Sequence, residues 1–161
     1  MSAPTNPPLL PGAVVIDASV VIAICAKEAG REPLALAELS LYSNQGYEFY
    51  APGVLVSEAL YVLCGKEQTG TLTPADYRQA VLELESLASG FLPPPNEGSL
   101  VIRSAEIRAG YGCSRAADSI YIALAEALAQ ERSTVLLTFD QGVPNHVAAS
   151  APTVTMKVLT V

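Results

Sequence analysis

The chain is predicted to fold as a single α/β domain of three layers, α/β/α, in which helices cover both faces of a mostly parallel central sheet. Short, continuously apolar runs recur along the 161 residues, as they do in parallel strands that are buried on both faces. Longer segments with helical spacing of apolar residues separate these runs. No long linker or internal repeat divides the chain, and its length suits one domain. This alternation is typical of an open parallel sheet.

Residues 1–12 are expected to form a flexible tail ahead of the folded domain at 13–161. Four prolines fall in this stretch, and such ends seldom pack as regular structure. It lacks a basic segment followed by an apolar core, so we do not expect a secretory signal. No apolar run approaches the ~18 residues of a membrane span, so no membrane association is expected.

Four short runs are predicted as strands of one parallel sheet. The first and third are almost wholly apolar, which indicates burial on both faces. Pro52 ends the second run, because proline cannot donate to a strand ladder. The predicted strands are 13–17, 48–51, 134–138 and 154–158, with a shorter run at 91–92.

The intervening segments are predicted as helices, and some carry clear start signals. Thr73 suits an N-cap, with Pro74 at the first helical position and Asp76 reaching back to the cap. Ser19 and Ser114 are also expected to cap helices. The predicted helices are 19–26, 32–43, 54–68, 74–88, 99–109 and 114–130, and an irregular turn containing Pro144 follows the third strand.

Four carboxylates, Asp17, Glu58, Asp118 and Asp140, stand where a charge is unfavourable. Asp17 and Asp140 each end an apolar run, and the other two interrupt the apolar pattern of a predicted helix. An isolated carboxylate taken out of water costs several kcal/mol unless a cation or hydrogen-bond donors compensate it. The chain has only four Asp residues, and three of them belong to this set. The four acids therefore predict a shared acidic pocket that holds a divalent metal.

The fold gives these acids a reason to converge. Ligands of open parallel sheets bind beyond the carboxyl ends of the strands, where Asp17 and Asp140 lie. Glu58 is on an inward-facing apolar stripe, and Asp118 is in the first turns of its helix, where the dipole favours a carboxylate. Oxygen ligands of this kind suit Mg²⁺ or Mn²⁺, whereas zinc would call for His or Cys. The only histidine, His146, is expected in a loop.

Each acid taken alone also has a simpler interpretation. Asp17 would serve as a strand-end turn or cap residue, Asp118 as a first-turn helix charge, and Asp140 as the start of the turn Asp-Gln-Gly. Glu58 is the hardest to explain in this way, because a glutamate on an apolar stripe usually needs a partner. Asp76 is a useful contrast, since capping explains it completely. The metal-site prediction depends on the combination.

Charge and cysteine usage set further limits. The net charge of −7 argues against a protein that coats nucleic acid through nonspecific attraction, although bound divalent cations would offset part of it. Cys25, Cys64 and Cys113 are odd in number, widely spaced and without a CxxC pair. They are expected to be buried thiols in a reducing cytosol.

The segments around the four acids resemble the successive motifs of PIN domains, and most closely those of VapC-type toxins from bacterial and archaeal toxin–antitoxin pairs. The resemblance spans roughly residues 13–160. The matching segments are Val15-Ile-Asp17-Ala-Ser19-Val-Val-Ile-Ala, Val56-Ser-Glu58-Ala-Leu-Tyr-Val-Leu63, Ala117-Asp118-Ser-Ile-Tyr-Ile-Ala-Leu-Ala-Glu126 and Leu137-Thr138-Phe-Asp140.

The resemblance implies catalytic and metal-binding roles for the four acids. Ser19 and Thr138 would be neighbouring polar residues that orient ligands or substrate. Arg115, one turn before Asp118, is a candidate phosphate contact, its alternative being an ordinary surface arginine. Tyr121 is expected mainly to pack in the core.

The activity that the resemblance implies is Mg²⁺- or Mn²⁺-dependent cleavage of a phosphodiester in RNA. The protein would be a cytoplasmic endoribonuclease, acting as the toxin of a toxin–antitoxin pair, with RNA as its substrate, a cognate antitoxin as its partner and a homodimer as its assembly. Metal-assisted hydrolysis needs no protein nucleophile, and the sequence offers no convincing Cys–His or Ser–His pair.

Three other functions remain open at this level. A PIN nuclease of RNA processing would carry the same four acids, and a small antitoxin frame just upstream would favour the toxin. A PIN domain used only for binding is less well supported, because all four acids are present. A phosphatase of the haloacid dehalogenase type would need a second acid two residues after Asp17, where Ser19 stands.

Overall fold

A computed structural model of the chain describes residues 9–113 and 117–161. The described residues form one parallel sheet with the strand order β2-β1-β3-β4. The four predicted strands and their parallel arrangement are confirmed. Their bounds are β1 (Ala13–Ile16), β2 (Glu48–Tyr50), β3 (Thr134–Thr138) and β4 (Met156–Val158).

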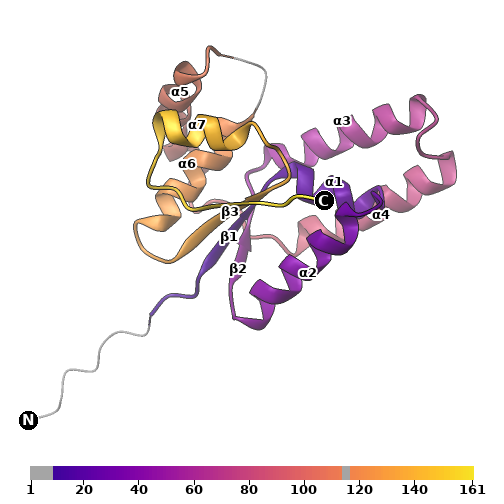
Figure 1. The fold of residues 1–161 in the computed structure, drawn as a ribbon, viewed down its shortest axis with the longest axis horizontal. Coiled ribbons are helices and arrows are strands. Elements are labelled where there is room, and N and C mark those ends of the chain that lie inside the picture. The colour runs from indigo at the N-terminus through magenta and orange to yellow at the C-terminus, as the bar shows by residue number, and fades with distance from the viewer. Residues whose placement is uncertain (1–8, 114–116) are drawn as a thin grey trace, which may run out of the picture.

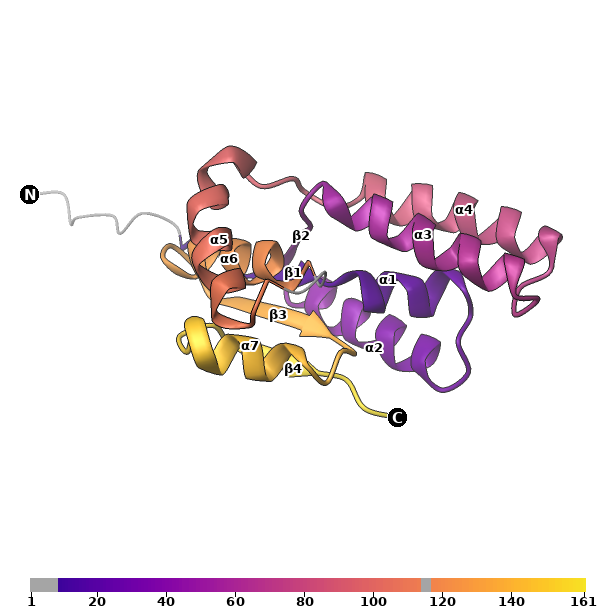
Figure 2. The same cartoon turned by 90° about the horizontal axis from the view of Figure 1, so that it is seen from above.

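Helices cover both faces of the sheet, which confirms the three-layer prediction. Figure 1 shows α5, α6 and α7 together on one side of the sheet and α2 on the other. The α3–α4 hairpin projects beyond the sheet in both views (Figures 1 and 2). The helices are α1 (Ala18–Cys25), α2 (Arg31–Asn44), α3 (Val54–Gln68), α4 (Pro74–Ser89), α5 (Val101–Gly110), α6 (Asp118–Ala129) and α7 (Val143–Ser150), with a short 3₁₀ helix at Glu97–Leu100 before α5.

The core is built around the two central strands. Val14, Val15 and Ile16 of β1 are completely buried, as is Leu137 of β3. Helix α6 packs against both strands and buries Ile122 among them. Side chains on both faces of β1 are therefore out of water, as its uninterrupted apolar sequence requires.

The prediction for the segment after β3 is wrong. An irregular turn was expected around Pro144, but this residue lies in the first turn of α7. Proline is tolerated there because the first helical N–H groups have no partner within the helix. The proline that predicted an irregular turn therefore stands at the start of a helix. This helix also carries His146, which was expected in a loop.

Two smaller expectations also change. Ser19 does not cap α1: the N-cap is Asp17, whose side chain accepts a hydrogen bond from the Ser19 N–H. The run at 91–92 makes a single parallel bridge, between Leu92 and Tyr50, instead of a strand. The expected helix start at Ser114 lies outside the described residues, and the first described helical residue of α6 is Asp118.

The three cysteines are not all buried, contrary to the expectation. Cys25 is buried and Cys64 is half-buried, but Cys113 is exposed. All three are free thiols. Burial raises the pKa of the Cys25 thiol to about 12, so it stays protonated and packs as a small apolar side chain.

Across the described residues, no helix combines the length and the apolar composition that a membrane span requires.

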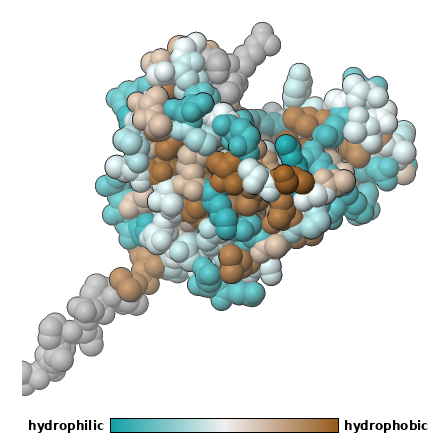
Figure 3. All heavy atoms as spheres, in the orientation of Figure 1, coloured by the Kyte–Doolittle hydropathy of each residue, from teal (hydrophilic) through white to brown (hydrophobic). Residues whose placement is uncertain are grey.

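Several apolar side chains stay exposed, on α2, α3, α4 and α5. Tyr61 of α3 is 83% exposed, and Val101 and Ile102 begin α5 with most of their surface in water. On the face seen in Figure 3, hydrophobic side chains gather in the middle, with hydrophilic ones around them. Residues 1–8 of the predicted tail lie outside the described residues. Leu9, the first described residue, is 98% exposed.

The last described residue returns to the edge of α2. Val161 lies against Gly30, where an added Cβ would come within 2.8 Å of a Val161 methyl carbon. Gly30 also has a φ of 77°, a conformation that other residues adopt at a cost. Val161 therefore lies beside the start of α2, whose first residue is Arg31.

Candidate metal centre

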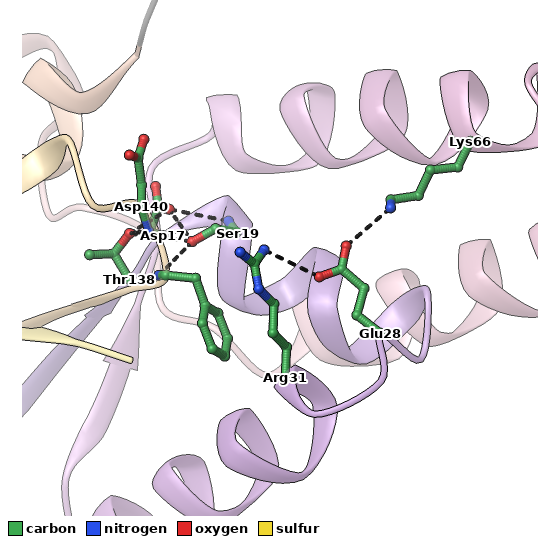
Figure 4. A network of polar contacts seen from close by, with 8 residues as sticks. Asp17, Ser19, Glu28, Arg31, Lys66, Thr138 and Asp140 are labelled. Carbon is green, nitrogen blue, oxygen red and sulfur yellow. Dashed lines mark hydrogen bonds and ion pairs between the residues drawn. The ribbon is translucent and has the colours of Figure 1, made fainter. Parts of the chain in front are cut away.

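Asp17 follows β1 and is held through one carboxyl oxygen. Its Oδ2 accepts hydrogen bonds from the Ser19 N–H (3.2 Å), the Ser19 hydroxyl (2.5 Å) and the Thr138 hydroxyl (3.0 Å). Thr138 is completely buried at the end of β3. Figure 4 shows these side chains meeting where the two neighbouring strands end. The simpler interpretation of Asp17 as a helix cap is thus correct, but capping engages only Oδ2.

Glu58 reaches the same region from α3. Its Oε1 accepts a 2.7 Å hydrogen bond from the hydroxyl of Tyr121 on α6. Tyr121 is 1% exposed, which confirms that it packs in the core. Burial, and then the charge of Glu58, raise the pKa of Tyr121, so its hydroxyl keeps its proton and donates. Glu58 therefore has the partner that a glutamate on an apolar stripe needs.

Asp118 begins α6 and is paired with the only histidine of the chain. The Nδ1 atom of His146 lies 2.7 Å from Asp118 Oδ2. The His146 ring stacks on Tyr111, with ring centroids 4.0 Å apart. The Tyr111 hydroxyl in turn accepts a hydrogen bond from the Ser119 N–H (3.2 Å). An ionised carboxylate can only accept, so Nδ1 of His146 donates to it.

Asp140 follows β3 and is the most exposed of the four acids. Its Oδ1 accepts a 2.8 Å hydrogen bond from the Gly142 N–H, as the turn interpretation requires. Its own N–H donates to the Thr138 hydroxyl (2.9 Å). Thr138 therefore connects Asp140 to Asp17 across the two strands.

A common pattern emerges from these contacts. Each of the four acids bonds to the protein through one carboxyl oxygen only, and the second oxygen has no hydrogen bond within the described residues. In residues 9–113 and 117–161, no three His, Cys, Asp or Glu side chains lie close enough together to hold a metal ion as they stand. Each acid is turned toward its own partner.

Neighbouring carboxylates affect the pKa values of Asp17, Glu58 and Asp118. Loss of water on burial is the main cause that raises the pKa of Asp17, and the charge of Asp140 adds to it against the hydrogen bonds of Ser19 and Thr138. Burial also raises the pKa of Glu58 most, with contributions from the charges of Asp17 and Asp118.

Asp118 follows the same pattern. Burial is the main cause that raises its pKa, the hydrogen bond from His146 opposes this, and the charges of Asp17 and Asp140 raise the pKa further. Carboxylate oxygens without a protein partner are hard ligands, and their chemistry suits Mg²⁺ or Mn²⁺.

The structure brings the four acids, Ser19 and Thr138 to one edge of the sheet. Arg115, the predicted phosphate contact, lies outside the described residues. Sequence reasoning missed the role of His146 and the hydrogen bond of Tyr121. Recognising α7 as a helix would have placed His146 in an ordered element, but no sequence signal pairs it with Asp118.

The comparisons with known proteins agree with this fold. The family model described as the PIN domain matches residues 14–148. No curated protein sequence matches the chain. VapBC2 from Rickettsia felis, solved bound to a DNA fragment from its promoter, is similar with a TM-score of 0.63 and 10% sequence identity, covering 92% of this chain and 99% of the other.

Two further solved structures are similar at lower TM-scores. PAE2754 from Pyrobaculum aerophilum has a TM-score of 0.53 and 18% identity, covering 91% of this chain and 83% of its own. FitAcB from Neisseria gonorrhoeae has a TM-score of 0.51 and 18% identity, with coverage of 89% and 95%. The family match spans most of the folded residues and includes all four acids, so the chain belongs to the PIN domain family.

Proposed function

We propose that the protein is a metal-dependent endoribonuclease. The observation that carries the proposal is the set of four carboxylates at one sheet edge, each with an oxygen that the described part of the chain leaves unbonded. Asp17, Glu58, Asp118 and Asp140 would hold Mg²⁺ or Mn²⁺. When bound, such an ion lowers the pKa of water and stabilises negative charge on phosphate oxygens.

The chain's own residues orient these acids. Ser19 and Thr138 fix Asp17 through Oδ2, so that Oδ1 is left for a ligand. Tyr121 of α6 does the same for Glu58, and His146 of α7 does the same for Asp118. Hydrogen-bonded support of this kind holds metal ligands in position and strengthens binding.

The proposal extends to a toxin of a toxin–antitoxin pair. The similarity to VapBC2 and FitAcB supports an antitoxin partner. The exposed apolar side chains of α3, α4 and α5 offer a surface that a homodimer would bury. We place the protein in the cytoplasm, where RNA is available. A small antitoxin frame directly upstream of the gene would support this role, and its absence would favour a nuclease of RNA processing.

Cleavage of RNA is the direct test. Purified protein is incubated with total RNA in Mg²⁺ or Mn²⁺, with and without EDTA, and the new RNA ends are mapped. We expect cleavage at discrete positions that stops in EDTA and returns when metal is added in excess. Single-stranded DNA of the same sequence serves as the control substrate. Cleavage that continues unchanged in EDTA would contradict the proposal.

The Tyr121→Phe variant tests the support of Glu58. It removes one hydroxyl from a buried ring and leaves the shape of the core. Without the hydrogen bond the carboxylate is less well placed and its pKa rises further. We expect Mn²⁺ affinity, measured by titration calorimetry, to fall by about 10-fold or more. Tyr61→Phe, at an exposed position of α3, should bind Mn²⁺ like the wild type, and equal affinities for both variants would count against this role of Tyr121.

A further inference from the structure

We propose that Arg31 is the phosphate-binding residue of the site, which holds a backbone phosphate of the nucleic acid beside the acidic edge. The inference rests on the proposed nuclease function and adds a substrate contact to it. The role proposed for the four acids is unchanged. Arg31 would bind a phosphate of the substrate backbone beside the bond that is cleaved.

The position of Arg31 is fixed by stacking. Its guanidinium carbon lies 5.2 Å from the ring centroid of Phe139. Phe139 stands between Thr138 and Asp140, and its N–H donates to the Ser19 hydroxyl (2.9 Å). Figure 4 shows the guanidinium turned toward Ser19, between the acids and Glu28. The ring that orients Arg31 is therefore part of the segment that carries the site.

Arg31 is available for a ligand. Its side chain is 47% exposed, and among the described residues its only ion pair is a 3.4 Å contact with Glu28. Glu28 has a closer partner in Lys66, at 3.1 Å. Exposed pairs of this kind contribute little and exchange easily. The two cations share one carboxylate, so this group carries a net positive charge next to four acids.

Arg132 is an arginine with a structural role and serves as a comparison for Arg31. Arg132 also stacks on an aromatic ring, that of Tyr50, at 5.7 Å. It precedes β3, at the amino ends of the strands, and its side chain is only 11% exposed and pairs with Glu48 at 3.1 Å. Arg31 has the same stacking at the opposite end of the sheet, but its side chain is far more exposed and makes only the long contact with Glu28.

The chemistry of Arg31 suits a phosphate. A guanidinium presents a planar fork of N–H donors that matches phosphate oxygens, and stacking on Phe139 restricts its orientation in advance. A chain of net charge −7 repels a polyanion over most of its surface, so binding requires a local cation. Arg31 and, beyond Glu28, Lys66 lie in a line that leads away from the acids, as Figure 4 shows.

The test measures RNA binding separately from cleavage. A fluorescein-labelled single-stranded RNA is titrated with Asp17→Asn protein in Mg²⁺, at several salt concentrations, and its anisotropy is followed. Adding Arg31→Gln is expected to weaken binding about tenfold and to reduce the slope of log K against log salt by about 0.7. Arg31→Lys keeps the charge without the fork, so its affinity should lie between the two. Arg78→Gln, at an exposed position of α4, removes the same charge and should change binding less than about twofold.

The outcomes separate this inference from the nuclease proposal. If Arg31→Gln binds RNA like Arg78→Gln, Arg31 is not the phosphate contact, whether or not the wild type cleaves RNA. If the wild type never cleaves RNA but Arg31→Gln still loses binding, the nuclease proposal fails and the contact stands. In an active enzyme, Arg31→Gln should raise KM more than it lowers kcat. Its melting temperature should stay within about 2 °C of the wild type, because the side chain is largely exposed.

Discussion

Asp17→Asn is expected to reduce RNA cleavage by about 100-fold or more while the protein stays folded. The substitution removes the negative charge that would hold the metal but keeps the size of the side chain. Asparagine also caps helices as well as aspartate does, so the hydrogen bond from the Ser19 N–H can remain. Because burial and the charge of Asp140 disfavour an ionised Asp17, we expect the melting temperature to be unchanged or higher.

Two control variants make this result interpretable. Asp17→Ala removes the cap as well as the charge, so it should be about 1 kcal/mol less stable than Asp17→Asn. Asp76→Asn changes a capping acid outside the site, whose carboxylate only accepts from the Thr73 hydroxyl (2.7 Å), and it should keep full activity with a small loss of stability. If Asp17→Asn cleaves RNA at the wild-type rate, the mechanism is wrong. If it does not fold, Asp17 has a structural role instead.

The metal-free protein is expected to lose stability as the pH rises from about 4 into the neutral range. Burial raises the pKa values of Asp17, Glu58 and Asp118 in the folded state, whereas unfolded carboxyls titrate near pH 4. Between these pKa values the folded chain binds more protons than the unfolded chain. The three groups therefore stabilise the fold at a pH below their unfolded pKa, and this contribution is lost as the pH rises through their folded pKa values. In EDTA, the melting temperature should be higher at pH 5.5 than at pH 7.5.

Metal should reverse this pH dependence. Mg²⁺ or Mn²⁺ binds the ionised carboxylates and competes with protons, so its stabilising effect grows with pH. At a metal concentration of about 100 times Kd, the melting temperature at pH 7.5 should rise by about 5–10 °C. Asp17→Asn should show a flatter pH profile in EDTA and a smaller response to metal, whereas Asp76→Asn should behave like the wild type. Parallel profiles for wild type and Asp17→Asn in EDTA would contradict the assignment.

The parts of the fold that the sequence predicts are those encoded by local patterns. The apolar run before Asp17 has no polar face, so it has to be a buried strand. Thr73 and Pro74 specify the start of α4 through local hydrogen bonds and a fixed φ. The four acids are recognisable because each conflicts with its apolar surroundings, and such conflicts are expected at functional sites.

The features that the sequence did not predict depend on contacts between distant segments. His146 and Asp118 are 28 residues apart, and Tyr121 and Glu58 are 63 apart. The first contact depends on the packing of α6 and α7 beside α5, where Arg103 bonds to both Glu126 (2.7 Å) and the Ser150 carbonyl (2.6 Å), and the second joins α6 to α3. Helix periodicity does not encode such tertiary contacts, and Pro144 obscured the helix that carries His146.

The packing of Val161 against Gly30 has a practical consequence for affinity tags. An extension of the chain after Val161 would emerge beside Arg31, and a run of histidines there would bring both bulk and metal-binding groups to the substrate side of the protein. Leu9, the first residue that the structure describes, lies on the amino side of β1, at the opposite end of the strand from Asp17. Metal-affinity purification and binding titrations are therefore best done with an N-terminal tag, and we expect a tag at the other end to lower RNA cleavage while the melting temperature stays unchanged.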